Sequence, residues 1–73
     1  MSSRDFVVCI NNEGLSASLE VRKIYQVLPD PDAENKGLLR VVDESAEDYL
    51  FPSARFMKIE LPKSVADALL AAA

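Results

Sequence analysis

The 73-residue chain has no histidine and no tryptophan, and it has one cysteine. Without histidine, acid–base chemistry near neutral pH and most metal sites lose the side chain that usually provides them. A single cysteine cannot form a disulfide within the chain. We therefore expect no cofactor, no metal and no internal disulfide, and we predict that the protein is not an enzyme.

Long apolar runs are also missing. The longest run near the start, residues 6–10, is too short for the core of a secretory signal, and no stretch approaches the ~20 apolar residues of a membrane helix. Together with the single cysteine, these features predict a chain in the reducing cytoplasm with no membrane partner.

Positive charge is scarce and is not clustered. The chain has 8 Lys and Arg against 12 Asp and Glu, which gives a formal net charge of −4, and most of the acids fall within residues 30–50. A nucleic-acid-binding surface needs a group of basic side chains, so we expect no nucleic-acid partner. Nucleic-acid binding is kept as the alternative function because small barrels of related shape often bind it. A positive face formed by Arg22, Lys23, Arg55 and Lys58 would favour that alternative.

The composition is that of a globular domain, with 49% apolar and 27% charged residues, and we expect one domain over residues 1–73. Runs of β-branched and aromatic residues between turn-forming residues predict strands. After Pro62 the apolar residues are spaced by four, which predicts a short helix that docks on the sheet. The expected elements are five antiparallel strands near 5–10, 22–28, 38–43, 48–52 and 56–61 and a helix at about 63–71.

The segments between the strands differ in clarity. Residues 15–22 fit both a helical and an alternating pattern, and we interpret them as a long excursion into the second strand. Residues 29–37 contain two Asp, two Pro and one Gly and predict an exposed loop. The polar residues 44–47 lie between two β-rich runs and predict a hairpin. Five short strands in so small a chain predict a compact barrel, since closure removes exposed edges.

Three segments follow one another along most of the chain. They read K-x-Y-x-V-L-P-D at residues 23–30, R-V-x-D-E-S-A-E-D-Y-L-x-P at 40–52 and F-x-x-x-E-L-P at 56–62. In these segments the chain resembles a group of short, uncharacterised bacterial proteins. The resemblance implies a mainly β fold, a five-stranded Src-homology-3-like small barrel in which residues 11–22 form the long first loop, and it implies no activity. The group usually has glycine at position 46, where Ala46 would cost about 1 kcal/mol if the turn needs a positive φ.

Two reactive patterns have simpler interpretations. Cys9 lies among apolar residues in a chain without histidine, so we interpret it as a packed, inert thiol rather than a nucleophile. The acids within residues 30–34 have the oxygen spacing that opens a calcium loop, but Asn35 replaces the expected glycine and Val41 the expected acid. We therefore expect a solvated acidic loop there.

Four of the five aromatic side chains are candidates for a contact surface: Tyr25, Tyr49, Phe51 and Phe56. They form either core and rim packing, which a small core needs, or a shallow surface that accepts Pro-rich or basic peptides. Peptide-binding Src-homology domains also have a tryptophan at their groove, which this chain lacks.

Four carboxylates surround the predicted hairpin turn, and we expect no catalysis from them because a barrel this small leaves no cleft. Tyr49 and Phe51 lie on the same face of their strand. If Leu50 fills the barrel, both aromatics lie outside, where a partner, a second copy or the C-terminal helix covers them. We therefore predict a non-enzymatic protein-interaction module that binds an unidentified, basic protein partner or associates with itself. The expected contact residues are Asp43, Glu44, Glu47, Asp48, Tyr49 and Phe51.

Overall fold

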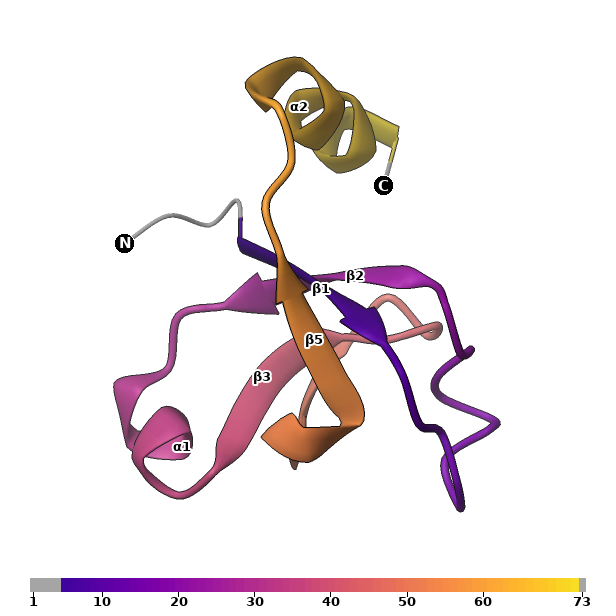
Figure 1. Cartoon of the computed structure of the whole chain (residues 1–73), viewed down its shortest axis with the longest axis vertical. Coiled ribbons are helices and arrows are strands. Elements are labelled where there is room, and N and C mark those ends of the chain that lie inside the picture. Colours follow the sequence, from indigo (N-terminus) through magenta and orange to yellow (C-terminus); the bar gives the residue numbers. More distant parts are fainter. Residues whose placement is uncertain (1–4, 73) are drawn as a thin grey trace.

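The computed structural model describes residues 5–72, which form a mainly β fold with a short C-terminal helix (Figure 1). All five predicted strands and the predicted C-terminal helix are present, with bounds within two residues of those expected. In chain order the elements are β1 (Asp5–Cys9), β2 (Ile24–Leu28), α1 (Pro31–Asn35), β3 (Leu38–Val42), β4 (Asp48–Pro52), the 3-10 helix η1 (Ser53–Arg55), β5 (Phe56–Ile59) and α2 (Lys63–Ala72).

The five strands form one antiparallel sheet in the order β4-β3-β2-β1-β5. The predicted hairpin is confirmed, because β3 and β4 pair in register with Leu39 opposite Phe51 and Val41 opposite Tyr49. The strand β1 lies between β2 and β5, so the last strand of the sheet pairs with the first.

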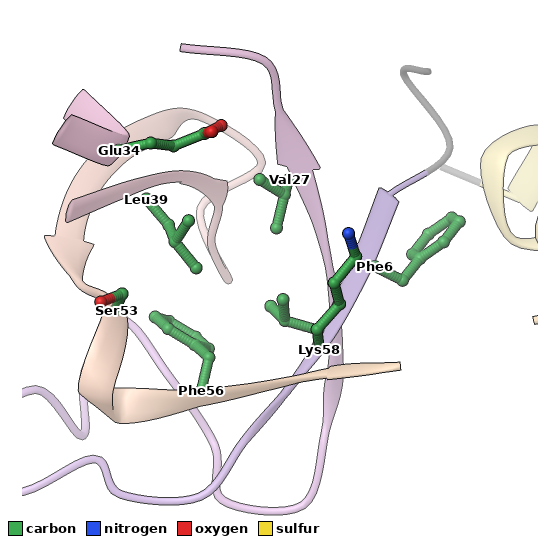
Figure 2. Close-up of a pocket in the computed structure, with 8 residues that line it drawn as sticks. Phe6, Val27, Glu34, Leu39, Ser53, Phe56 and Lys58 are labelled. Carbon is green, nitrogen blue, oxygen red and sulfur yellow. The ribbon is translucent and has the colours of Figure 1, made fainter. Parts of the chain in front are cut away.

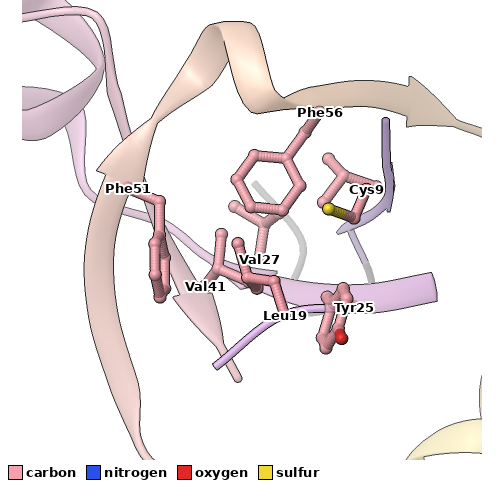
Figure 3. Packing of buried hydrophobic residues seen from close by; sticks show 8 residues of the cluster. Cys9, Leu19, Tyr25, Val27, Val41, Phe51 and Phe56 are labelled. Carbon is pink, nitrogen blue, oxygen red and sulfur yellow. The ribbon is translucent and has the colours of Figure 1, made fainter. Parts of the chain in front are cut away.

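The edges of the sheet are β4 and β5, and the strand pairings within residues 5–72 do not include one between them. The edges meet through side chains instead. The rings of Phe51 on β4 and Phe56 on β5 lie 6.1 Å apart, edge to face, on the inner side of the sheet (Figure 3). The sheet is therefore curled, and its two edge strands share one core.

The core is built from the inner face of every strand and from one loop residue (Figure 3). Alternate positions face inward, as period two requires. Leu19 belongs to the long loop between β1 and β2, yet its side chain is fully buried, and Asn12 Nδ2 donates to its carbonyl oxygen at 3.0 Å. The long excursion is thus a loop, as predicted, and it supplies a core residue. The core side chains are Val7, Cys9, Leu19, Tyr25, Val27, Val41, Phe51 and Phe56.

The prediction of an exposed loop at residues 29–37 is wrong, because this stretch contains α1. Asp30 is the N-cap, and its carboxylate accepts a hydrogen bond from Ala33 N at 3.1 Å. Pro31 occupies the first helical position, where its fixed φ suits a helix and its missing N–H costs nothing. Ala33 is buried, so the short helix is held by one cap and one packed side chain.

The helix α2 packs against the outer face of the sheet, opposite the core. The Phe6 side chain points away from the inner face toward α2 (Figure 2), and both Phe6 and Ala66 are buried. The neighbouring stripe of Val65 and Leu69 is 43% and 40% exposed, so only part of the apolar side of the helix is covered. Within residues 5–72, neither helix has the length and apolar character needed to cross a membrane.

Candidate functional site

The hairpin turn is organised by Asp43, whose side chain is buried at 7% exposure. Its carboxylate accepts hydrogen bonds from the backbone N–H and the hydroxyl of Ser45, and its carbonyl accepts from Ala46 N at 3.0 Å. Ala46 has a φ of 68°, so the turn does need a positive φ at this position. Asp43 was predicted to contact a partner, but its carboxylate is used inside the turn, because Asp side chains stabilise such turns by bonding to the backbone.

Glu44 joins this turn to the long first loop. Its carboxylate accepts a hydrogen bond from the Tyr25 hydroxyl at 2.6 Å and lies 2.8 Å and 2.7 Å from Lys23 Nζ. The Tyr25 oxygen in turn accepts from Glu20 N at 2.7 Å. The hydrogen bonds from Lys23 and Tyr25 lower the pKa of Glu44, while burial and the bond to Glu44 raise the pKa of Tyr25. The Glu44 carboxylate is therefore a structural link between two segments.

The remaining acids of the turn are on the surface. The Tyr49 hydroxyl donates to Glu47 at 2.9 Å, and this bond raises the pKa of Tyr49. Asp48 pairs at 3.0 Å with Arg40, whose Nε also lies 2.8 Å from Asp30. The Ala33 N–H and then Arg40 lower the pKa of Asp30. Of the six predicted contact residues, Glu44, Glu47, Asp48 and Tyr49 are exposed, and among these four the Glu44 carboxylate is bound by Lys23 and Tyr25.

Phe51 requires a correction, because it is 5% exposed while Tyr49 is 49% exposed. The two aromatics share the inner face, but the curl of the sheet brings Phe51 against Phe56 and leaves Tyr49 beyond the core, near the turn. Leu50 does not fill the interior and is 43% exposed. Tyr49 borders a hollow of about 370 Å³ whose other lining residues are Ala17, Ser18, Asp43, Ser45 and Phe51. The expected pair of exposed aromatics is thus a single tyrosine.

A larger hollow, of about 540 Å³, opens on the inner face at the other end of β3 (Figure 2). We call it the inner groove. Its apolar floor is formed by strand residues of the core face, and its rim comes from α1, η1 and β5. The floor residues are Val7, Val27, Leu39 and Phe56, and the rim residues are Glu34, Ser53 and Lys58. Phe6 also lines the hollow, on the side toward α2 (Figure 2).

The rim of the inner groove has two opposite charges without partners. The ion pairs and side-chain hydrogen bonds of residues 5–72 include neither Glu34 nor Lys58. Ser53 is the one hydroxyl among the lining residues, and the lining has no base beside it to activate it. The arrangement suits binding of an apolar group between two charges, and it offers no nucleophile–base pair.

Most of the other sequence candidates are held by contacts within the fold. Cys9 is fully buried, and its Sγ lies 3.6 Å from Asn11 O, as suits a packed thiol. Among residues 5–72, no three Cys, Asp or Glu side chains form a group that could hold a metal ion. Of the four bases that a positive face would need, Lys23 binds Glu44, and Arg55 donates to Asn11 Oδ1 at 2.9 Å and to Glu13 O at 2.8 Å.

Sequence reasoning found the acidic turn but missed the inner groove. Phe56 was considered as an aromatic and Lys58 as part of a positive face, but not as neighbours in one hollow. The alternating pattern that places Val27, Leu39 and Phe56 on the inner face was a usable signal. The rim was not predictable, because it depends on α1 and η1, which bring Glu34 and Ser53 to the same opening.

Comparison of the chain with models of protein families, with curated proteins and with solved structures gives no match. A function must therefore be inferred from the two surfaces themselves. The acidic turn has carboxylates that mostly bind their own fold, whereas the inner groove has an apolar floor and two unpaired charges.

Proposed function

We propose that the chain is a non-enzymatic protein-interaction module, and that its curled sheet is a Src-homology-3-like small barrel. Two features support the barrel. A long loop follows β1, as the sequence resemblance implies, and the edge strands meet through Phe51 and Phe56. Fold alone does not assign a function, so the proposal of binding depends on the inner groove.

The observation that supports the proposal is the open, apolar floor of the inner groove between two unpaired charges. Its volume of about 540 Å³ lies in the range of binding pockets, and such pockets combine an apolar lining with a few polar groups that fix orientation. The occupant is an extended segment of a partner protein. A large apolar side chain of that segment enters the groove between Leu39 and Phe56, a basic residue faces Glu34 and an acidic residue faces Lys58.

Selection from a displayed library of random peptides tests this directly. Peptides with an apolar residue between a base and an acid should be enriched, and binding to the ¹⁵N-labelled chain should shift the amide signals of the groove residues. Charge reversal by Glu34→Lys should weaken the selected peptide roughly tenfold. The matched control is Asp32→Lys, which reverses an exposed acid of the same helix outside the groove and should have little effect. Signal shifts at the acidic turn, with the groove unchanged, would contradict the proposal.

The exposed part of the acidic turn is a second candidate surface, for a basic partner. Tyr49 is 49% exposed, and Glu47 and Asp48 lie beside it. Reversal of Glu44 would confuse this test, since that carboxylate holds Tyr25 and Lys23. Glu47→Lys alone should lower the capture of basic proteins without lowering the melting temperature. Unchanged capture would remove this surface from consideration.

Nucleic acid is not the proposed partner. The net charge of −4 repels phosphates, and two of the four candidate bases are bound by acceptors of the chain. We expect oligonucleotides to bind no more tightly than about 10⁻⁴ M at physiological salt. A salt-sensitive gel shift at lower protein concentration would contradict this expectation.

A further inference from the structure

The outer face of the sheet has an apolar row across three strands, with a half-buried valine at its centre and exposed side chains around it. The register places Ile24 of β2 opposite Val8 of β1, and Val8 opposite Met57 of β5. Ile24 is 39% exposed and Met57 60%, and Ile10, two residues after Val8, is 49% exposed. We call these four residues the outer apolar row. It has no charged member, although more than a quarter of the chain is charged.

The helix α2 covers the neighbouring part of the same face and leaves part of its own apolar surface unused. Its Ala66 is buried, as is Phe6, which points toward it from β1 (Figure 2), while Val65 and Leu69 remain 43% and 40% exposed. Leu69 and Ile24 line one hollow of about 540 Å³ between α2 and β2, so the apolar surface of the helix continues onto the outer apolar row. One chain thus presents both an uncovered sheet surface and an unused helix surface.

We propose that a second copy of this chain covers the outer apolar row in a two-fold symmetric dimer. In it, Val65 and Leu69 of each copy pack on the row of the other copy. A two-fold interface requires that both complementary surfaces be present on each subunit, which this arrangement satisfies. Depletion of charge and the presence of methionine in the centre of the surface are also typical of interfaces between protein chains.

Two unpaired charges favour a second copy over an unrelated partner. Arg22 lies at the Ile10 end of β1, since its N–H donates to Cys9 O at 2.7 Å. Glu60 lies at the other end, since it follows Ile59, which pairs with Phe6. Both side chains are exposed, and the ion pairs of residues 5–72 include neither of them. A two-fold axis that places the Ile10 end of one copy on the Phe6 end of the other brings Arg22 opposite Glu60 twice.

Sedimentation equilibrium of the full chain, from about 10 μM to about 1 mM, tests the dimer. The wild-type mass should rise with concentration from 8.0 kDa toward twice that value. Met57→Lys, at a 60% exposed position, should weaken the dimer roughly tenfold or more without unfolding the chain. The matched control is Leu50→Lys. Leu50 is 43% exposed on the edge strand β4, where it pairs with Arg40 of β3 and lies outside the outer apolar row. This variant should not change the mass of the wild-type assembly. A wild-type mass of 8.0 kDa at every concentration would overturn the proposal, and so would equal effects of the two lysine variants.

The two-fold arrangement has its own test. Arg22→Glu and Glu60→Arg should each weaken the dimer, and the double variant should restore it. Arg22 has a φ of 71°, and glutamate keeps the Cβ there, so the backbone strain is the same in both forms. A double variant that associates no better than the single ones would contradict the symmetric pairing. These outcomes are independent of the inner groove, whose peptide binding is measured on the opposite face of the sheet.

Discussion

The two ends of β3 use charge in different ways. At the Val42 end, the carboxylate of Asp43 accepts hydrogen bonds from its own turn, and those of Glu44 and Asp48 bind Tyr25 and Arg40 of neighbouring strands. At the Leu38 end, Glu34 and Lys58 of the inner groove have no such partners within residues 5–72, and they flank an apolar floor. A dense group of acids is therefore not the same as an available binding surface. The end with fewer charges is the one whose charges are free to meet a ligand.

The largest expected difference in the free energy of unfolding is between variants of Phe51 and Tyr49, which lie on the same edge strand. Phe51 lies toward the inner groove, and Tyr49 lies at the turn. Phe51→Ala should destabilise the fold by about 3–5 kcal/mol, because it removes a buried ring that packs on Phe56. Tyr49→Ala should stay within about 0.5 kcal/mol, as exposed positions usually do. Urea denaturation measures both.

A loss of 3–5 kcal/mol leaves so small a domain largely unfolded. Phe51→Leu keeps most of the buried volume and should cost less than about 1.5 kcal/mol, so it provides a folded variant for the same measurement. If Phe51→Ala were as stable as Tyr49→Ala, the assignment of Phe51 to the core would be wrong.

The next prediction compares the stability lost on removing Glu44, whose carboxylate is bound, with that lost on removing Glu34, whose carboxylate has no partner within residues 5–72. Glu44→Ala should cost about 1–3 kcal/mol, because the buried Tyr25 hydroxyl loses its acceptor. Glu34→Ala, on the rim of the inner groove, should leave the free energy of unfolding unchanged within about 0.5 kcal/mol. Thermal denaturation of the two variants measures this difference. Equal losses of stability would contradict the view that the acids at the two ends of β3 have different roles.

Acid should weaken the bound end selectively. The pKa of Glu44 is lower in the folded chain than its ordinary value of 4.5, so the unfolded chain binds this proton more readily. The contribution of Glu44 is therefore complete above that value and is lost as the pH falls through the lowered pKa. The melting temperatures of wild type and Glu44→Gln should converge as the pH falls below the ordinary pKa of 4.5. A difference in melting temperature that stays constant as the pH falls would show that the carboxylate charge is not responsible.

The smallest expected effect is a gain in stability. Ala46 holds a φ of 68° in the turn, where glycine has no steric penalty. Ala46→Gly should stabilise the fold by about 0.5–1 kcal/mol, which raises the melting temperature by roughly 2–8 °C in a chain of this size. As a control, Ala54→Gly in η1 lacks a positive φ and should be neutral or destabilising. A lower melting temperature for Ala46→Gly would contradict the proposed strain.

The strands were predictable because residues 5–10 and 38–43 are rich in β-branched side chains and end at turn-forming residues. The glycine of the resembling proteins raised the question of a positive φ at position 46, and the structure answers it with a φ of 68°. The helix α1 was missed although its signals were present. An Asp followed by Pro marks a helix start as well as a turn, and five residues are too few to show a helical period.

The candidate site was predicted less well, because burial in a curled sheet depends on distant segments. Alternation placed Tyr49 and Phe51 on one face correctly, but only the position of Phe56 decides which of them is covered. Leu19 reached the core through a loop that has no clear period. Carboxylate partners such as Tyr25 and Lys23 lie about 20 residues from Glu44 in the sequence, and spacing alone gives no sign of such contacts.

The fully buried Cys9 makes it possible to measure how often the sheet opens locally in the native state. It is the single thiol, and it lies at the end of β1, the strand that joins β2 to β5. A thiol reagent reaches it only when β1 separates from its neighbours, so the rate of labelling in the native state measures how often that happens. When reclosing is fast, the labelling rate gives the free energy of opening without added denaturant. Labelling at increasing protein concentration would then read out how a second copy slows the opening.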